Sequence, residues 1–253
     1  MPCRITARNV AVSYTAPDGD TLPALGPVSL RIEPASFVSV VGPSGCGKST
    51  LLRVIAGLQP VTRGAALLDD ETIEKPSPRV GVMFQDANLM PWRTVRDNIA
   101  LPLELANQPK ETRYRAVQDM LPLLGLTEFP LAYPGELSGG MAQRVALGRV
   151  LIQHPDVLLL DEPFGALDAL TREHISADLL RIWAQDRQTV VMVTHDINEA
   201  VRMSDRVIVL SPRPGKIVRD VRVDLPRPRK LEDTYSDAFG AIAQQVRNAI
   251  QRV

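Results

Sequence analysis

A run of nine residues, GPSGCGKST, combines glycines, a lysine and hydroxyl groups at a spacing that can hold a phosphate chain. Glycines let backbone N–H groups turn toward an anion, and the N-terminus of a following helix adds partial positive charge. Lys48 is expected to bridge the outer phosphates, and the Ser49 hydroxyl to hold Mg²⁺. The motif predicts that a nucleoside triphosphate is bound by Gly42, Pro43, Ser44, Gly45, Cys46, Gly47, Lys48, Ser49 and Thr50.

Two adjacent carboxylates, Asp161 and Glu162, follow the apolar run VLLL at 157–160. Ligands of open α/β sheets bind at the carboxyl ends of the strands, where these residues are expected to lie. Asp161 is suited to the Mg²⁺ shell, and Glu162 could polarise a water molecule against the γ-phosphate. The alternative is a strand end that simply turns acidic, but the phosphate-binding motif in the same chain favours the catalytic interpretation.

A third motif, LSGGMAQR at 137–144, opens a predicted helix with Ser138 as a suitable N-cap. Together the three motifs resemble those of ATP-binding-cassette (ABC) ATPases, although Met141 stands where that family usually has Gln. In the family, two copies pack head to tail, and each signature helix caps the γ-phosphate on the other copy's phosphate loop. The resemblance implies ATP as the ligand, with Ser138, Gly139 and Gly140 touching the ATP bound by a second copy.

The same resemblance implies roles for further residues. Tyr14 matches the aromatic that stacks on adenine, Gln85 the glutamine that touches Mg²⁺ and the attacking water, and His195 the histidine at the γ-phosphate. Asp168, in the sequence GALD, matches a loop that crosses the dimer interface. An ordinary strand aromatic and a surface histidine are the alternatives for Tyr14 and His195. The expected catalytic residues are Lys48, Gln85, Glu162 and His195, and the expected Mg²⁺ ligands are Ser49, Gln85 and Asp161.

Hydrophobic patterning supplies the elements that must position these groups. The first forty residues alternate, which predicts antiparallel strands joined by the turn Pro17-Asp18-Gly19-Asp20. Nearly continuous apolar runs predict buried strands, and helical spacing lies between them. The strands are expected at 37–41, 80–84, 156–161, 189–194 and 206–210. The helices are expected at 51–56, 95–105, 112–124, 138–153, 169–185 and 197–203.

The expected fold is therefore α/β, with buried parallel strands and a helical subdomain inserted at about 87–153. In the terms of the resemblance, this is a P-loop NTPase (RecA-like) core with an N-terminal antiparallel β subdomain and an inserted α-helical subdomain. Residues 1–230 are expected to form the ABC ATPase domain, and 231–253 a C-terminal amphipathic helix. The basic, proline-rich stretches SPRPGK and LPRPRK between them are interpreted as solvated connectors.

Composition narrows the function classes. The 253 residues carry 29 basic and 29 acidic side chains. The chain therefore lacks the net positive charge that would support bulk nucleic-acid binding. Cys3 and Cys46 are too few for a disulfide scaffold and indicate free thiols in a reducing compartment. Cys46, inside the phosphate loop, is expected to react with a bulky thiol reagent unless ATP protects it. No signal peptide or membrane helix is visible, so a membrane would be met only through a partner.

Finer details resemble the bacterial importers of nitrate, sulfonate and taurine. Only 90 residues separate Lys48 from Ser138, too few for a long coiled-coil arm, and MPWRTVRDNI, FGALDALTR, LSPRPGKI and DLPRPR are similar to that group. The resemblance implies a homodimer on the cytoplasmic face of the inner membrane, bound to permease subunits and served by a substrate-binding protein, with no nucleic-acid partner. Leu89, Met90 and Trp92 would line the permease groove, unless Leu89 and Met90 are core residues. An exporter subunit and a soluble ATPase acting on nucleic acid or ribosomes are the alternatives.

Overall fold

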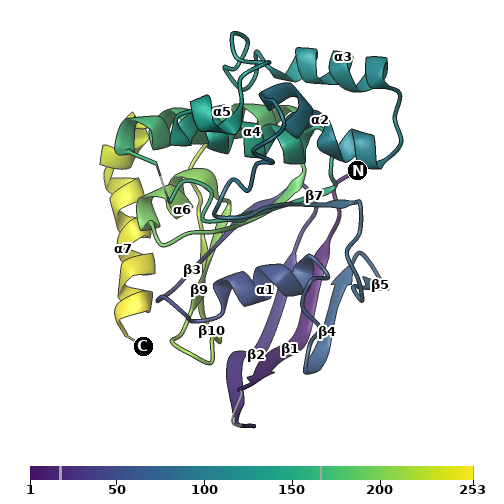
Figure 1. Ribbon diagram of the computed structural model, residues 1–253. Helices are drawn as coiled ribbons and strands as arrows, with labels where there is room; N and C mark the ends of the chain where they lie inside the picture. The colour runs from purple at the N-terminus through teal and green to yellow at the C-terminus, as the bar shows by residue number, and fades with distance from the viewer. Residues whose placement is uncertain (17–18, 166, 253) are drawn as a thin grey trace. The chain divides into compact units, whose positions relative to one another are not determined.

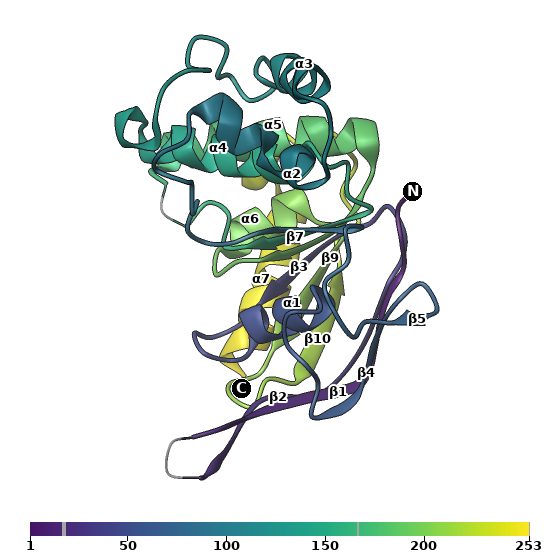
Figure 2. The same ribbon diagram turned by 45° about the vertical axis from the view of Figure 1, so that its right-hand side comes forward.

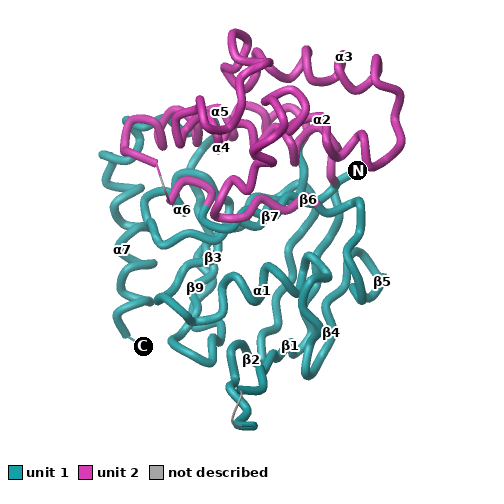
Figure 3. Tube along the Cα trace, viewed as in Figure 1, with its two compact units in different colours: residues 1–80, 156–162, 187–253 teal, residues 81–155, 163–186 magenta. Residues whose placement is uncertain are grey.

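The structure, a computed structural model, describes residues 1–16, 19–165 and 167–252 (Figure 1). Pro17 and Asp18 of the predicted turn, and Ala166 of the GALD loop, lie outside these residues. The chain forms two compact units (Figure 3). Unit 1 comprises Met1–Val80, Asp156–Glu162 and Arg187–Val253, and unit 2 comprises Gly81–Pro155 and Pro163–Asp186.

The central sheet of unit 1 has the strand order β10-β9-β3-β8-β7. Four of these strands run parallel, whereas β10 pairs with β9 in antiparallel fashion, so the predicted parallel sheet has one antiparallel edge. Every residue of β3 and β8 is buried, as their unbroken apolar character requires. The bounds are β3 Phe37–Val41, β7 Val157–Asp161, β8 Thr189–Val193, β9 Arg206–Leu210 and β10 Ile217–Arg222. Strand β6, Val80–Met83, begins at the last residue of the first segment of unit 1.

A second, antiparallel sheet in unit 1 has the order β2-β1-β4-β5 and confirms the predicted antiparallel start of the chain. Its strands are β1 Ile5–Thr15, β2 Thr21–Ile32, β4 Arg63–Leu68 and β5 Glu71–Thr72. The register of β1 shifts between Ala7 and Val10, where Asn9 has a φ of 50°. This bulge explains why the buried positions step from Ala7 to Val10 rather than to residue 9. Helix α1, Lys48–Ile55, lies between the two sheets (Figures 1 and 2).

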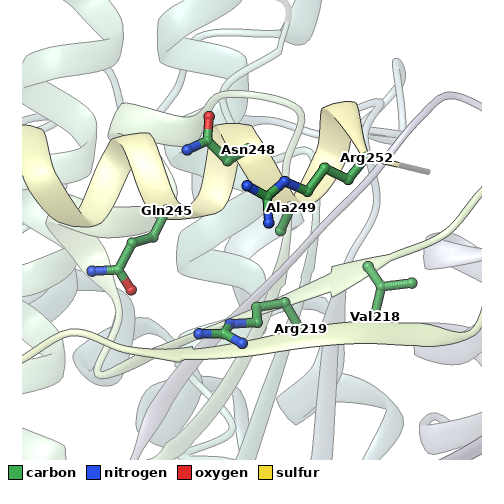
Figure 4. A pocket seen from close by; sticks show the side chains of 6 residues that line it. All are labelled: Val218, Arg219, Gln245, Asn248, Ala249 and Arg252. Atoms are coloured by element: carbon green, nitrogen blue, oxygen red, sulfur yellow. The ribbon is translucent and has the colours of Figure 1, made fainter.

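Two helices in the C-terminal part of the chain pack together in unit 1. Helix α6, Ile197–Met203, and α7, Asp237–Gln251, share an apolar cluster that includes Val201, Phe239 and Val246. The helix expected from residue 231 begins only after Ser236, which caps α7; a short 3₁₀ turn, η2 Glu232–Tyr235, precedes it. A groove between β10 and α7, shown in Figure 4, contains none of the predicted site residues; it is lined by Val218, Arg219, Gln245, Asn248, Ala249 and Arg252.

Unit 2 is helical. It contains α2 Val95–Leu105, α3 Lys110–Met120, α4 Gly139–Leu151, α5 Ala169–Asp186 and the 3₁₀ turn η1 Pro134–Glu136. Gly148 permits close packing here, because a Cβ at this position would lie 2.4 Å from Leu124 Cδ1. Across residues 1–16, 19–165 and 167–252, no helix is long and apolar enough to cross a membrane.

Residues 81–155 leave unit 1 and return to it, and the residues of unit 1 on either side of this segment are bonded to each other. The carbonyl of Arg79 accepts hydrogen bonds from Asp156 N at 2.9 Å and Val157 N at 3.0 Å. The Arg79 side chain also pairs with Asp156, at 2.7 Å. These bonds hold unit 1 together at the point where the chain leaves it and returns to it.

Candidate functional site

The predicted phosphate loop joins β3 to α1. Gly47, the N-cap of α1, has a φ of 101°, and a Cβ on it would lie 2.6 Å from Ala24 O. Only glycine suits this position, because the backbone is left-handed and the space is already filled. In the described part of the chain, no side chain caps the start of α1. Its first N–H groups can therefore bind an anion.

Lys48 lies across this loop and is 7% exposed. Its Nζ donates to Gly42 O at 2.9 Å and to Pro43 O at 3.0 Å. Both acceptors are neutral carbonyls. A phosphate oxygen would be the stronger partner, because charge-assisted hydrogen bonds are about twice as strong as neutral ones. The ammonium is thus held within the loop, where it can exchange carbonyls for phosphate.

Ser49 and Asp161 form a hard-oxygen pair beside the loop. Ser49 Oγ donates to Asp161 Oδ1 at 3.0 Å. Burial raises the pKa of Asp161, and the neighbouring Glu162 carboxylate raises it further, although the Ser49 hydrogen bond opposes both. No group of three His, Cys, Asp or Glu side chains that could hold a metal occurs among the described residues. A cation held by Ser49 and Asp161 would therefore need further oxygen atoms, such as those of a bound phosphate chain.

Glu162 and His195 face each other at the ends of β7 and β8. His195 Nδ1 lies 3.1 Å from Glu162 Oε2. Glu162 has a φ of 46°, which is uncommon for a residue other than glycine. Its N–H donates to Val193 O at 2.9 Å, so the adjacent strands fix its backbone. A carboxylate at hydrogen-bonding distance from an imidazole is suited to proton transfer.

A pocket of about 350 Å³ gathers most of these groups, within the size range of small-molecule sites. Tyr14 OH lies 3.4 Å from Thr50 Oγ1 at its wall. The lining residues are Tyr14, Ala24, Ser44, Gly45, Gly47, Lys48, Ser49, Thr50, Glu162 and Arg213. Residues of the phosphate loop, Tyr14 and Glu162, all predicted from sequence, thus belong to one unit and surround one space, and Asp161 is bonded to Ser49 of its lining.

Arg213 is a pocket residue that the sequence interpretation missed. It lies in SPRPGK, and its Nε donates to Pro23 O at 2.9 Å. Gly215 of the same stretch packs against the phosphate loop so closely that a Cβ would come within 1.9 Å of Cys46 O. The interpretation of SPRPGK as a solvated connector is therefore wrong at Gly215, which is buried, whereas Arg213 is exposed and lines the pocket. No pattern in the sequence indicates these contacts.

Both thiols are buried, which counts against the expected reactivity of Cys46. Burial raises the pKa of Cys46 and outweighs the opposing effect of Lys48. Burial and the Asp156 carboxylate raise the pKa of Cys3 to about 12. Since the thiolate is the reactive form, neither cysteine is activated at neutral pH.

The signature residues lie in unit 2. Ser138 caps α4 by accepting a hydrogen bond from Met141 N at 3.3 Å, and Ser138 and Gly139 are exposed. A Cβ at Gly140 would lie 2.5 Å from Thr171 Cγ2, so this glycine also serves packing on α5. The exposed start of α4 can receive an anion from outside the unit.

Gln85 also lies in unit 2, with an exposed side chain, and its loop is tied to α4. Gln143 Nε2 donates to Gln85 O at 2.9 Å, and Arg149 Nη2 donates to Ala87 O at 2.6 Å. The structure thus joins the Gln85 loop to the signature helix within unit 2. The phosphate loop, Tyr14, Asp161, Glu162 and His195 lie in unit 1. Trp92, farther along the loop, is 72% exposed.

Comparisons with known proteins agree with this arrangement. The ABC transporter family model matches residues 25–165. The chain is 48% identical to an uncharacterized ABC transporter ATP-binding protein, MJ0412, of Methanocaldococcus jannaschii, over 84% of this chain and 79% of the relative. It is 44% identical to the aliphatic sulfonates import ATP-binding protein SsuB of Bacillus cereus, over 92% of both chains.

A solved structure is similar over most of the chain. The ATP-binding cassette MJ0796, described as a dimeric post-hydrolysis state bound to ADP and Pi, superposes with a TM-score of 0.78 and 34% identity, covering 88% of this chain and all of that one. The predicted family and cassette fold are confirmed. The chain therefore belongs to the ABC transporter family, as an ATP-binding protein with the cassette fold of its ATPases.

Proposed function

We propose that the chain is the ATP-hydrolysing subunit of an importer for small oxyanionic solutes, with organic sulfonates as the first class and nitrate and taurine as related candidates. The observation that carries the proposal is the Glu162–His195 pair beside a phosphate loop in one unit. The substrate class is supported by the 44% identity to the aliphatic sulfonates import protein of Bacillus cereus.

ATP would occupy the pocket with its phosphates on the loop and its adenine toward Tyr14. Lys48 would exchange its two carbonyl partners for phosphate oxygens, and Arg213 adds a second cation to the lining. Glu162 would accept the proton of the attacking water. His195 would orient that carboxylate and meet the γ-phosphate.

Mg²⁺ suits the hydroxyl and carboxylate oxygens of Ser49 and Asp161, because it prefers hard oxygen ligands completed by substrate phosphates. Gln85 is the third expected ligand. When bound, the ion supplies positive charge to the phosphate oxygens. A cation there would also offset the cost of burying the Asp161 carboxylate, which its raised pKa reflects.

The partners are inferred from unit 2, in which Trp92 and the residues Ser138 and Gly139 at the start of α4 are exposed. A second copy, packed head to tail, would bring Ser138, Gly139 and Gly140 to the γ-phosphate; the similar cassette MJ0796 is described as dimeric. Leu89, Met90 and Trp92 would meet a permease at the inner membrane, and a binding protein would deliver the solute from outside. ATP-driven closure of the dimer would move the permease, and hydrolysis would reopen it.

The decisive experiment is transport. The chain is co-expressed with a candidate permease, reconstituted in proteoliposomes, and offered an alkanesulfonate, taurine and nitrate separately. ATP-dependent accumulation that stops in the Glu162→Gln variant supports the proposal. Outward transport would favour an exporter. Recovery of the chain with ribosomes or nucleic acid, and no permease, would favour the soluble ATPase.

A further inference from the structure

Helix α6 starts two residues after His195, with Asp196 as its N-cap, and its first turn holds the residues on both sides of that histidine. Thr194 Oγ1 donates to Glu199 Oε2 at 2.6 Å, and Glu199 N donates to Asp196 Oδ1 at 3.0 Å. Asp196 N in turn donates to Thr194 Oγ1 at 3.1 Å. Because α6 holds the Thr194 side chain and Asp196 on either side of His195, a shift of the helix would move the chain that carries this histidine.

The other end of α6 is held by two arginines from LPRPRK, a stretch interpreted from sequence as a solvated connector. Arg229 Nη1 donates to the carbonyls of Val201, Arg202 and Ser204, at 3.0, 3.3 and 2.5 Å. Arg227 Nη2 donates to Met203 O at 2.6 Å. These are the last carbonyls of the helix, which have no partner within the helix itself.

Arg229 also reaches the chain beyond β10. Its Nη2 donates to Val223 O at 3.2 Å and to Leu225 O at 3.0 Å. The side chain thus bridges α6 to the segment that leaves the central sheet, and Arg229 is only 8% exposed. Burial lowers its pKa to about 10, so it stays charged at neutral pH, where a cation is favourable at a helix C-terminus.

Backbone bonds of the central sheet hold both members of the pair as far as the end of β8. Glu162 N donates to Val193 O, and Thr194 N donates to Val40 O at 3.3 Å. Beyond Thr194, the chain that carries His195 is held by α6, so the 3.1 Å separation of His195 Nδ1 and Glu162 Oε2 depends in part on where α6 sits. Helix α6 has only seven residues, and so short a helix holds its place through tertiary contacts rather than on its own.

We propose that Arg227 and Arg229 are positioning residues for ATP hydrolysis: by capping α6 they set His195 against Glu162. The inference rests on the proposed function, since it assumes that His195 and Glu162 act on ATP. It gives LPRPRK a role in turnover although neither arginine lines the nucleotide pocket.

The test compares Arg229→Lys and Arg227→Ala with the wild type, and Arg206→Ala serves as the matched control. Arg206 also donates to a backbone carbonyl of unit 1, Arg31 O at 2.8 Å, but it does not cap α6. Loss of positioning is expected to lower kcat about 10-fold and to leave the KM for ATP nearly unchanged. The control should retain the wild-type kcat. Each assay runs well below the variant's own Tm, so that unfolding does not contribute.

A double-mutant cycle with His195→Ala identifies the route of the effect. If the arginines act through His195, Arg229→Lys should lower kcat in the wild type and have no further effect once the imidazole is gone. An equal fold-loss in both backgrounds overturns the inference, as does a lowered Tm with unchanged kcat. If His195→Ala alone leaves kcat unchanged, it is the proposed role of His195 that fails. If Arg229→Lys does not fold, Arg227→Ala is tested in the same cycle.

Discussion

Ser49 donates a 3.0 Å hydrogen bond to Asp161 although 112 residues separate them in the chain. The bond joins the first turn of α1 to the end of β7. It connects the phosphate loop to the acidic pair without any ligand. The carboxylate that is expected to bind Mg²⁺ is therefore oriented by the same hydroxyl that would share the ion.

As the pH falls, Mg²⁺-dependent hydrolysis is expected to weaken at a higher pH than it would if Asp161 had the pKa of an ordinary aspartate. Burial raises the pKa of Asp161, so this group takes up a proton while ordinary carboxyls are still ionised. Protonation competes with a metal ion for the carboxylate. The measurement is the Mg²⁺ concentration for half-maximal ATPase activity from neutral to mildly acidic pH. A concentration that stays constant over this range contradicts the prediction. The control is Asp161→Asn, which should bind Mg²⁺ weakly at every pH.

Glu162→Gln should abolish turnover and preserve ATP binding. The amide keeps the shape of the side chain but cannot accept a proton, and loss of a general base costs ~10²–10⁴ in rate. ATP with Mg²⁺ should then trap a dimer, which light scattering detects. Hydrolysis at the wild-type rate would assign the base to another group, with His195 next in line. An inactive variant that stays monomeric would argue against dimerisation without the permease.

Lys48→Ala should strongly reduce both ATP affinity and turnover. It removes the ammonium held within the phosphate loop and leaves the carbonyls of Gly42 and Pro43 without this donor. Titration of a fluorescent ATP analogue measures the affinity. Lys110→Ala, which removes an exposed lysine of unit 2, should bind as the wild type does. Normal hydrolysis by Lys48→Ala would show that the loop is not the phosphate site.

Ser138→Arg should prevent hydrolysis while the monomer still binds ATP. Ser138 is exposed at the start of α4, where a large cation would obstruct an approaching second copy. Ser138→Ala removes only the cap, which costs about 1 kcal/mol, and separates the loss of stability from obstruction. Strong loss of ATP binding by the Ser138→Arg monomer would mean that the site is not shared between copies.

Neither thiol should react quickly in the folded protein. Cys46 is 0% exposed and its pKa is raised by burial, and the pKa of Cys3 is about 12. A chromogenic disulfide reagent should therefore find both thiols only after unfolding. One fast-reacting thiol in the native protein that disappears in Cys46→Ser would restore the expectation drawn from sequence.

Local patterns predicted much of this architecture. Helix α2 has its expected bounds because Thr94 caps it and apolar residues repeat at helical spacing, and the buried strands β3, β7 and β8 differ from expectation by one residue at most. The phosphate loop was predictable because its glycines have a local role. At Gly47, for example, the backbone conformation itself demands glycine.

Long-range contacts could not be predicted in this way. Strands β4, β5 and β10 have short or mixed patterns, and only their pairing partners make them strands. The burial of Arg229 depends on carbonyls more than twenty residues away in the chain, and composition alone indicates a solvated cation. Arg213 reaches the pocket because its loop packs on Cys46 O through Gly215, a contact with no sequence signature.

The bonds from Arg79 O to Asp156 N and Val157 N have a consequence for how such proteins diversify. They join the two segments of unit 1 between which residues 81–155 leave and return. A segment whose flanking residues are bonded together can change in length without separating the two points at which the chain leaves and re-enters unit 1. On the proposed assignment, that segment carries the permease-facing residues. Descendants of one ATPase could thus acquire new transport partners by exchange of this segment, provided that the incoming segment supplies its own counterparts of Gln85, Ser138, Gly139 and Gly140, which the segment also carries.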